Sequence, residues 1–325
     1  MPSPPPTNGQ GGSTAATVID CYEFFDRVFP ECGLQDLTEG LYFDNPATPY
    51  EQAQRNQIEW LLDEIHCESC SCILDIGCGY GTLLEAATER GAKAVGITIS
   101  PAQAARCRAK GLDVYLLNYQ DLPEEWSGSF DGIVANGSIE HFAQAQDVLR
   151  GEVDRVYQNL FEICHRLIDP LSPARRLATT VIHQCENSPR LQDADLLKHP
   201  WAFQWGSPKF HYVIMQRSFG GFYPELGQLE RCAGPMFQKV REVNGTHDYH
   251  LTSEECFRRV RAALRSWRVG PRIWRRLGTL LLKRPPFCMY MCCCLLVSES
   301  WQWQFRGEHP PTRLLRQTWE WLPCS

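Results

Sequence analysis

The sequence contains no apolar run long enough to cross a bilayer as a helix. Its longest apolar stretch, residues 287–297, is about half of the roughly 20 residues that a spanning helix needs. Residues 1–6, MPSPPP, provide neither the basic start nor the apolar segment of a secretory signal. We therefore expect a cytoplasmic protein, which leaves peripheral contact with the inner face of the membrane open.

An excess of positive charge is also missing. The 325 residues include 32 Lys and Arg against 38 Asp and Glu, which gives a net charge of −6 and predicts no nucleic-acid partner. Residues 258–284 are different, because they hold ten basic side chains and no acidic one, together with Trp267 and Trp274. Trp and Arg side chains suit a membrane interface, so we expect peripheral membrane contact here, with a solvated helix face as the alternative.

A complete set of metal ligands is the third absence. Cys67, Cys70 and Cys72 form a CxxCxC pattern, but no second CxxC and no pair of histidines follows at a suitable distance. The sequence therefore predicts no metal site. Cysteines are nevertheless frequent, with 16 in the chain, and we expect them to be mostly reduced. The run 292–294 lies in apolar surroundings and is expected to pack as small buried hydrophobes.

The most informative stretch is an apolar run that ends in an acid and in glycines two residues apart. Residues 73–83 read ILDIGCGYGTL, and the segment that follows has high helix propensity, so a strand, a tight turn and a helix are predicted. A dinucleotide fingerprint, GxGxxG, needs its third glycine at the position of Thr82. The observed pattern, DxGxGxG, instead resembles motif I of the class I S-adenosylmethionine (SAM) methyltransferases.

Apolar runs that alternate with helical patterns predict an α/β fold. We expect strands at 73–76, 94–99, 114–117, 130–135, 176–183 and 240–243, and helices at 18–29, 50–65, 146–166, 226–233 and 253–267. Residues 184–221 are expected to be an irregular aromatic connection, long enough to be functional or a sub-domain. The chain after 267 is expected to be helical as far as Trp319.

Residues that follow the predicted strands are the candidate cofactor contacts, because parallel strands deliver their carboxyl ends to one edge of the sheet. We expect the amino-acid end of SAM beside the glycine turn, its ribose beside the second strand and its adenine beside the third. The second strand lacks the terminal acid that many SAM enzymes direct at the ribose, so hydroxyl and amide groups are expected there. The predicted contacts are Asp75, Gly77, Cys78, Gly79, Thr98, Ile99, Gln103, Asn118, Tyr119 and Gly137.

A series of motifs across residues 22–317 resembles the cyclopropane fatty acid synthases, including the mycolic acid cyclopropane synthases. The motifs are LDIGCGYG at 74–81, GITISPAQ at 96–103, NYQD at 118–121, ANGSIEH at 135–141 and FGGFYPE at 219–225. The resemblance implies a class I SAM-methyltransferase (Rossmann-like) sheet flanked by helices, with an N-terminal helical cap and a C-terminal helical extension. The expected parts are a disordered tail (1–16), the cap (17–66), the SAM-binding core (67–255, with an aromatic insertion at about 184–221) and a basic, Trp-rich helical extension (256–325).

The resemblance also implies residues for the reaction. Enzymes of this family transfer the SAM methyl group to a cis double bond of a lipid acyl chain, and a bound bicarbonate then removes a proton so that a ring closes. The family's active-site glutamate corresponds to Glu140, and a tyrosine that lines the site corresponds to Tyr249. Its bicarbonate-binding cysteine falls on Gly40 and its histidine falls near Thr180, so the nearby His183 is the candidate histidine.

Three functions remain open on the sequence. The first is a SAM-dependent methyltransferase that acts on an unsaturated or lipid-like acceptor and gives a cyclopropane or a methyl branch. The second is a C- or N-methyltransferase of a small soluble metabolite, and the third is an inactive SAM-fold protein that binds a lipid surface or another protein. The altered bicarbonate shell favours methyl transfer over ring closure. Methyl incorporation into lipid, into small amines or into neither distinguishes the three.

Overall fold

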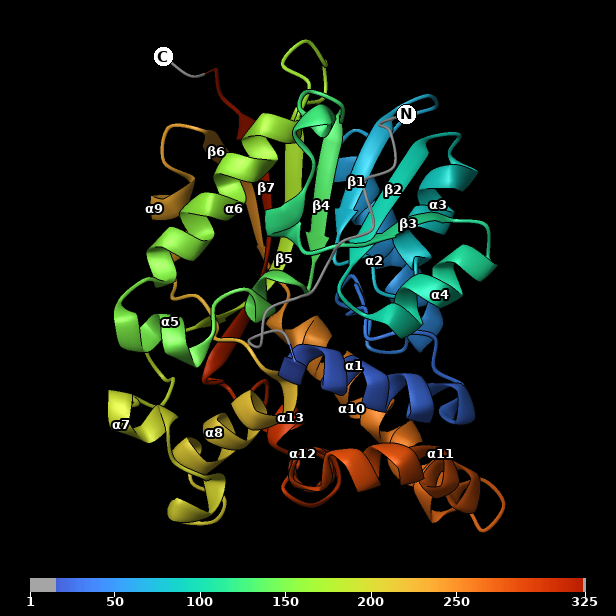
Figure 1. Cartoon of the computed structure of the whole chain (residues 1–325), viewed down its shortest axis with the longest axis vertical. Coiled ribbons are helices and arrows are strands. Elements are labelled where there is room, and N and C mark those ends of the chain that lie inside the picture. Colours follow the sequence, from blue (N-terminus) through green and yellow to red (C-terminus); the bar gives the residue numbers. More distant parts are fainter. Residues whose placement is uncertain (1–15, 324–325) are drawn as a thin grey trace.

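The computed structural model describes residues 16–323, so the tail predicted at 1–16 lies outside the described residues except for Ala16. A seven-stranded sheet with the order β3-β2-β1-β4-β5-β7-β6 forms its centre (Figure 1). The parallel strands are β1 (Cys72–Ile76), β2 (Lys93–Thr98), β3 (Asp113–Leu116), β4 (Gly132–Asn136) and β5 (Arg176–Gln184). Their apolar residues are buried from both faces, as expected for a parallel sheet, and the predicted α/β architecture is confirmed.

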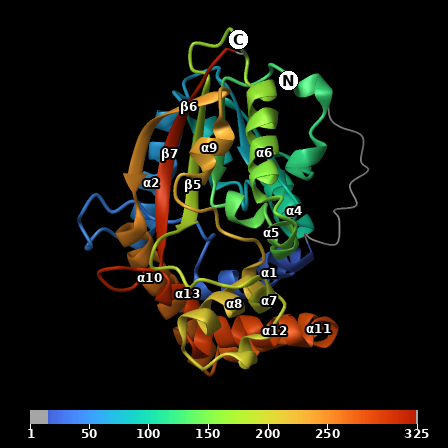
Figure 2. The same cartoon turned by 90° about the vertical axis from the view of Figure 1, so that its left-hand side faces the viewer.

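Helices cover both faces of the sheet (Figures 1 and 2). One face packs against α2 (Tyr50–Glu64), α3 (Thr82–Glu89) and α4 (Pro101–Ala109), and the other against α6 (Val153–Leu167) and α9 (Gln228–Ala233). The helix expected at 146–166 is divided into α5 (Ala145–Arg150) and α6. The division falls at Gly151, whose left-handed backbone (φ +68°) ends α5.

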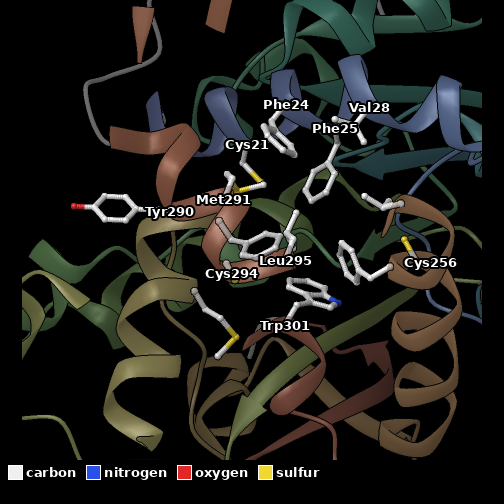
Figure 3. Packing of buried hydrophobic residues seen from close by; sticks show 14 of the residues in the cluster. Cys21, Phe24, Phe25, Val28, Cys256, Tyr290, Met291, Cys294, Leu295 and Trp301 are labelled. Carbon is white, nitrogen blue, oxygen red and sulfur yellow. The ribbon is translucent and has the colours of Figure 1, made fainter. Parts of the chain in front are cut away.

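A second layer of helices lies at the carboxyl ends of the parallel strands (Figure 1). It consists of α1 (Ala16–Val28), α7 (Asp193–Leu196), α8 (Pro208–Phe219), α10 (Thr246–Arg265), α11 (Gly270–Lys283), α12 (Pro285–Cys292) and α13 (Ser300–Trp303). Figure 3 shows their apolar side chains converging in one cluster, with Phe24 and Phe25 of α1 at one side and Cys294 and Trp301 at the other. Cys293 and Cys294 belong to this core, which confirms their predicted packing.

Two expectations about the second half of the chain are wrong. The connection 184–221 is only partly irregular, because it contains α8, where Ser207 caps the amino end by accepting a hydrogen bond from the Phe210 N–H. The chain does not stay helical to Trp319 either. Residues Thr312–Trp321 form β7, which lies between β5 and β6 (Phe237–Asn244) and is antiparallel to both.

The strand β7 escaped prediction because three successive buried residues at its centre are polar. Arg316, Gln317 and Thr318 are all fully buried, and each has partners from distant parts of the chain. Gln317 donates to Glu242 (3.0 Å) and Thr318 donates to Glu64 (2.5 Å). A segment that buries polar groups in this way shows no apolar alternation, which is the main local signal of a strand. The last part of the predicted helical extension therefore belongs to the central sheet.

Residues 16–323 contain neither a membrane-spanning helix nor a cluster of metal ligands. No helix in this part of the chain is long and apolar enough to cross a membrane. Cys67, Cys70 and Cys72 do not form a ligand cluster, and no group of three or more His, Cys, Asp or Glu side chains that could hold a metal ion occurs within the same residues.

Candidate functional site

A cavity of about 330 Å³ lies between the carboxyl ends of the strands and the second helical layer. All ten residues predicted to contact the cofactor line it, because they follow neighbouring parallel strands. The opposite wall is formed by residues that come from the cap, from the turn after β4 and from the C-terminal half. These include Val18, Tyr22, Glu39, Glu140, Phe219, Tyr223, Tyr249, Trp301 and Leu314.

The glycine turn after β1 brings two backbone segments close together and leaves space for a ligand. Gly77 is left-handed (φ +86°), and a Cβ atom there would lie 2.5 Å from Cβ of Ser138. Gly79 (φ +52°) and Gly137 (φ +65°) are also left-handed, but in the described chain no atom lies within 4 Å of the position of an added Cβ. Because both glycines line the cavity, side chains at these positions would occupy the space of a ligand.

Asp75 at the end of β1 is poised for a cationic group. Only 3% of its surface is exposed, and within residues 16–323 its Oδ1 atom has no hydrogen-bond partner. Burial raises the pKa of this carboxyl to about 8, because the charged form is poorly solvated. An ammonium group bound beside Asp75 would stabilise the carboxylate, so the residue fits the amino-acid end of SAM.

The ends of β2 and β3 supply neutral polar groups and aromatic rings. The Thr98 hydroxyl donates to Oε1 of Gln103 (2.8 Å), and Ser100 caps the helix α4. Tyr119 stacks on Phe142 with ring centroids 4.1 Å apart and planes at 14°. Hydroxyl and amide groups can bind ribose hydroxyls, and a stacked aromatic pair offers a flat surface to a purine. These residues therefore fit the predicted ribose and adenine subsites.

Glu140 lies in the turn Ile139–His141 after β4, and only 4% of it is exposed. Its Oε1 atom accepts a hydrogen bond from the Ile182 backbone N–H (2.8 Å), whereas its Oε2 atom has no partner in the described residues. Burial raises the pKa of Glu140 to about 8, and the negative charge of Glu39 contributes to the rise. The cavity therefore contains a carboxyl group that ionises readily only when positive charge is near it.

Tyr249 lines the same cavity from within α10, which begins at Thr246, before the predicted start at 253. Its ring packs against Phe305 at 4.6 Å and against Trp301 at 5.8 Å between centroids. Burial raises the pKa of the phenol, so the hydroxyl stays neutral and can serve as a hydrogen-bond donor. The structure thus brings Glu140 and Tyr249 into one cavity, as the resemblance implies.

His183 does not join them. Successive residues of a strand point to opposite faces of the sheet, so Thr180 and Ile182 face α2 and the cavity, whereas His183 faces α9. The ring is fully buried, its Nδ1 atom is 3.0 Å from the Val181 carbonyl, and burial lowers its pKa to about 4. The expected catalytic histidine is therefore a neutral residue on the opposite face of the sheet from the cavity.

Gly40 has no room for the side chain that the resemblance places there. An added Cβ atom would lie 2.7 Å from Tyr42, 2.8 Å from Ala53 and 2.9 Å from Thr252. The preceding residue, Glu39, lines the cavity instead, and only 3% of it is exposed. Sequence reasoning missed Glu39 because it lies in an irregular segment, where no periodicity shows which side chains point inward.

Most ionisable side chains on the cavity wall are carboxyl groups. Five of them line it, and in the described residues no Lys or Arg does so; the acids are Asp36, Glu39, Asp75, Glu140 and Asp147. Burial raises the pKa of Asp75, Glu140 and Glu39, so positive charge in the cavity would favour their ionised forms. Such a cavity favours cationic ligands or cationic transition states.

Comparisons with known proteins agree with this geometry. Residues 34–192 match the sequence model of the family described as "Mycolic acid cyclopropane synthetase". A relative from Pseudomonas putida, named "Probable fatty acid methyltransferase", is 33% identical over 153 residues, which are 44% of this chain and 38% of that protein. The "Cyclopropane-fatty-acyl-phospholipid synthase" of Escherichia coli K12 is 26% identical over 218 residues, 66% of this chain and 48% of that protein. The chain thus spans less than two thirds of the length of these relatives.

A solved structure shows the same fold over nearly the whole chain. The mycolic acid cyclopropane synthase CmaA1, complexed with SAH and CTAB, superposes with a TM-score of 0.66 at 20% sequence identity. The superposition covers 96% of this chain and 99% of that protein. The fold is therefore that of the class I SAM methyltransferases of the cyclopropane synthase type, as predicted.

Proposed function

We propose that this chain, whose residues 34–192 match the model of the mycolic acid cyclopropane synthetase family, is a SAM-dependent methyltransferase of an unsaturated, lipid-like acceptor. The observation that carries the proposal is a cavity lined by five carboxyl groups and, in residues 16–323, by no basic side chain except His141. SAM supplies a methyl group on a positively charged sulfur. Its transfer to a double bond leaves positive charge on the acceptor, which an acidic cavity stabilises.

One wall of the cavity would bind the cofactor, and the opposite wall would bind the acceptor. Asp75 and the glycine turn hold the amino-acid end of the cofactor, and the residues after β2 and β3 surround its ribose and adenine. The second helical layer supplies an apolar and aromatic wall for the acceptor, with Phe219, Tyr249 and Trp301 among its members. Aromatic faces tolerate hydrocarbon and also attract a nearby cation. This combination suits an acyl chain that becomes positively charged during the reaction.

Glu140 is the residue that we propose to offset the charge on the acceptor. The hydrogen bond from the Ile182 N–H fixes one oxygen, and the other oxygen is available to the reacting group. We expect Glu140→Gln to leave SAM affinity near normal and to lower turnover at least about tenfold, or ~1.4 kcal/mol of barrier. An amide keeps the hydrogen bond but carries no negative charge. The measurement is calorimetric SAM binding beside methyl transfer from labelled SAM.

The pH dependence of stability checks the Glu140 carboxyl without an acceptor. Its folded pKa of about 8 lies above its ordinary value of 4.5, so between these pH values the folded protein binds the proton more tightly. The contribution of this group to the free energy of unfolding is therefore lost as pH rises towards 8. Glu140→Gln should gain stability relative to wild type over that window. If turnover is also unaffected by the substitution, Glu140 has only a structural role.

Methyl incorporation tests the substrate class. Labelled SAM should transfer its methyl group to vesicles of phospholipid with cis double bonds, and the acyl chains should gain 14 mass units if a methylene group is added. The alternative is a C- or N-methyltransferase of a small metabolite, because an acidic aromatic cavity also suits a protonated amine. Label in small amines and none in lipid would favour that alternative, and label in neither would favour a binding protein.

We also propose that the surface of 258–284 contacts anionic lipid. Six of its basic residues form ion pairs: Arg258, Arg259, Arg261, Arg272, Arg276 and Arg284. Trp267 and Leu282 project outward with exposed fractions of 78% and 86%, and the Arg268 guanidinium lies over the Trp267 ring at 4.6 Å. Exposed apolar side chains beside Arg suit the lipid headgroup region. The ion pairs reduce the effective charge, so the contact is weaker than the sequence alone suggests.

Sedimentation with vesicles measures this contact. Binding should rise with the content of anionic lipid and fall with salt, because each basic residue near the surface contributes about 1 kcal/mol. Reversal of Arg268 and Arg275 to Glu should weaken binding more than reversal of Arg258, which pairs with Glu255. A wild-type protein that ignores anionic vesicles at low salt would contradict the membrane contact.

A further inference from the structure

We call the part of the cavity wall that carries Glu39, Glu140 and Tyr249 the acceptor side. A buried polar network adjoins it, with Gln57 of α2 at its centre. The residues Asn136, Thr180 and Arg316 are register partners on the adjacent strands β4, β5 and β7. Gln57 spans this row, because its Nε2 atom donates to Thr180 (3.1 Å) and its Oε1 atom accepts from Nε of Arg316 (2.6 Å). The same Nε2 atom donates to Oε1 of Glu39 at 2.7 Å. The network thus holds the Glu39 carboxyl at the cavity wall.

Arg316 brings a fully buried positive charge to this network. Its guanidinium donates to Asp248 (2.8 Å) and to the Gly40 carbonyl (2.8 Å), in addition to Gln57. These contacts fix the Gln57 amide, so its nitrogen rather than its oxygen points at Glu39. A carboxyl group that accepts a hydrogen bond near a cation is stabilised in its ionised form.

The two carboxyl groups of the acceptor side therefore have different environments. Burial raises the pKa of Glu39, but Arg316 and hydrogen bonding with Thr180 oppose the rise. Glu140 has only backbone donors, and the charge of Glu39 raises its pKa further, to about 8. Both carboxyl groups act on the Tyr249 phenol, whose pKa each raises. When two neighbouring carboxyl groups have unequal environments, one ionises first and takes the role of base.

We propose that Glu39 is the proton acceptor of the methyl-transfer reaction, a carboxylate fixed in the chain that faces the cation formed on the acceptor. The inference rests on the proposed function and adds a catalytic residue to it. Glu39 lies next to Gly40, where a Cβ atom would collide with Tyr42, and Gln57 connects it to Thr180. These are the two positions at which the residues implied for a bicarbonate shell are absent. The chain supplies a carboxylate at that place, so the reaction requires no bicarbonate.

The step balances without a further reactant. The electron pair of the acceptor double bond forms the new carbon–carbon bond to the methyl group, while the carbon–sulfur pair stays on sulfur. Positive charge develops on the second carbon of the double bond. A proton then leaves either from the transferred methyl group, with ring closure, or from a neighbouring carbon, with formation of a double bond. Glu39 accepts this proton and becomes neutral, and it returns the proton to solvent after the product leaves.

The first arm of the test measures cation binding and needs no turnover. Decyltrimethylammonium, a fixed cation on an alkyl chain, is titrated calorimetrically into the protein loaded with S-adenosylhomocysteine. Glu39→Gln keeps an oxygen for the Gln57 donor and removes only the charge. We expect it to weaken cation binding at least about tenfold. The control is Glu51→Gln, which removes an exposed carboxylate that pairs with Arg259 outside the cavity and should leave binding unchanged.

The second arm measures methyl transfer from labelled SAM to cis-unsaturated phospholipid vesicles. Glu39→Ala should lower turnover about 100-fold or more, because general bases contribute at this level. Added formate should restore at least about tenfold of the loss by occupying the vacated space, and wild-type turnover should not change when bicarbonate is removed.

Three results would overturn the inference: unchanged cation binding in Glu39→Gln, full turnover in Glu39→Ala, or loss of wild-type turnover without bicarbonate. A wild-type protein that methylates no lipid would count against the proposed function instead. In that case the cation-binding arm alone decides whether Glu39 faces a cation.

Discussion

Gly79→Val is expected to weaken SAM binding by at least about 1,000-fold, which is ~4 kcal/mol. Gly79 lines the cavity, its backbone is left-handed (φ +52°), and the described chain has no atom within 4 Å of an added Cβ. A branched side chain would therefore project into the space where the amino-acid end of the cofactor is predicted. Calorimetry with SAM and with S-adenosylhomocysteine measures the loss.

Gly111→Val provides the matched control for this prediction. Gly111 is also left-handed (φ +81°), and an added Cβ there meets nothing within 4 Å among residues 16–323, but Gly111 does not line the cavity. Both substitutions should destabilise the fold by about 1–3 kcal/mol through backbone strain. Only the substitution at Gly79 should remove cofactor binding. Equal SAM affinity in the two variants would show that the cofactor lies elsewhere.

Gly221→Ala is expected to lower the free energy of unfolding by about 3–5 kcal/mol, from strain and overpacking together. Gly221 is left-handed (φ +85°), and an added Cβ would lie 2.0 Å from the Glu140 carbonyl oxygen and 2.8 Å from Cα of His141. The obstructing atoms belong to the backbone, so the turn that carries Glu140 must move. Turnover should fall with stability, because the carboxyl group moves with its backbone.

Chemical denaturation of Gly221→Ala and Gly227→Ala separates the cost of the contact with the Glu140 backbone from the cost of backbone strain. Gly227 has a similar backbone (φ +77°), and among the described residues nothing lies within 4 Å of an added Cβ. The Gly227 variant should lose only the strain contribution, about 1–3 kcal/mol. If both variants unfold at the same denaturant concentration, the contact between Gly221 and the Glu140 turn is looser than the structure shows.

Local patterns were sufficient to predict the parallel strands of the sheet. The strands β1 to β5 are short apolar runs bounded by turns, and each was predicted within a few residues. Parallel strands place their carboxyl ends at the same edge of the sheet, so the residues predicted to contact the cofactor necessarily lie together there. The spacing of the glycines in ILDIGCGYG distinguishes a SAM turn from a dinucleotide turn on the sequence alone.

The acceptor side could not be predicted in the same way. Glu39, Gln57 and Arg316 come from an irregular segment, from α2 and from β7, and no local pattern connects them. Side chains alternate between the two faces of β5, so Thr180 lies beside Gln57, whereas His183 lies on the face opposite the cavity.

By itself, the sequence determined the α/β class, the glycine turn and the set of residues that line the cavity at the carboxyl ends of the parallel strands. These depend on apolar runs and on backbone freedom, which are properties of neighbouring residues. Only the tertiary structure decided that β7 completes the sheet, that His183 is excluded from the cavity and that Glu39 is admitted to it. The position of His183 follows from the alternation of side chains along β5. The other two outcomes depend on buried polar groups that are stable only with distant partners, as Arg316 is with Asp248 and Gln57. Such partners become visible when the chain is folded.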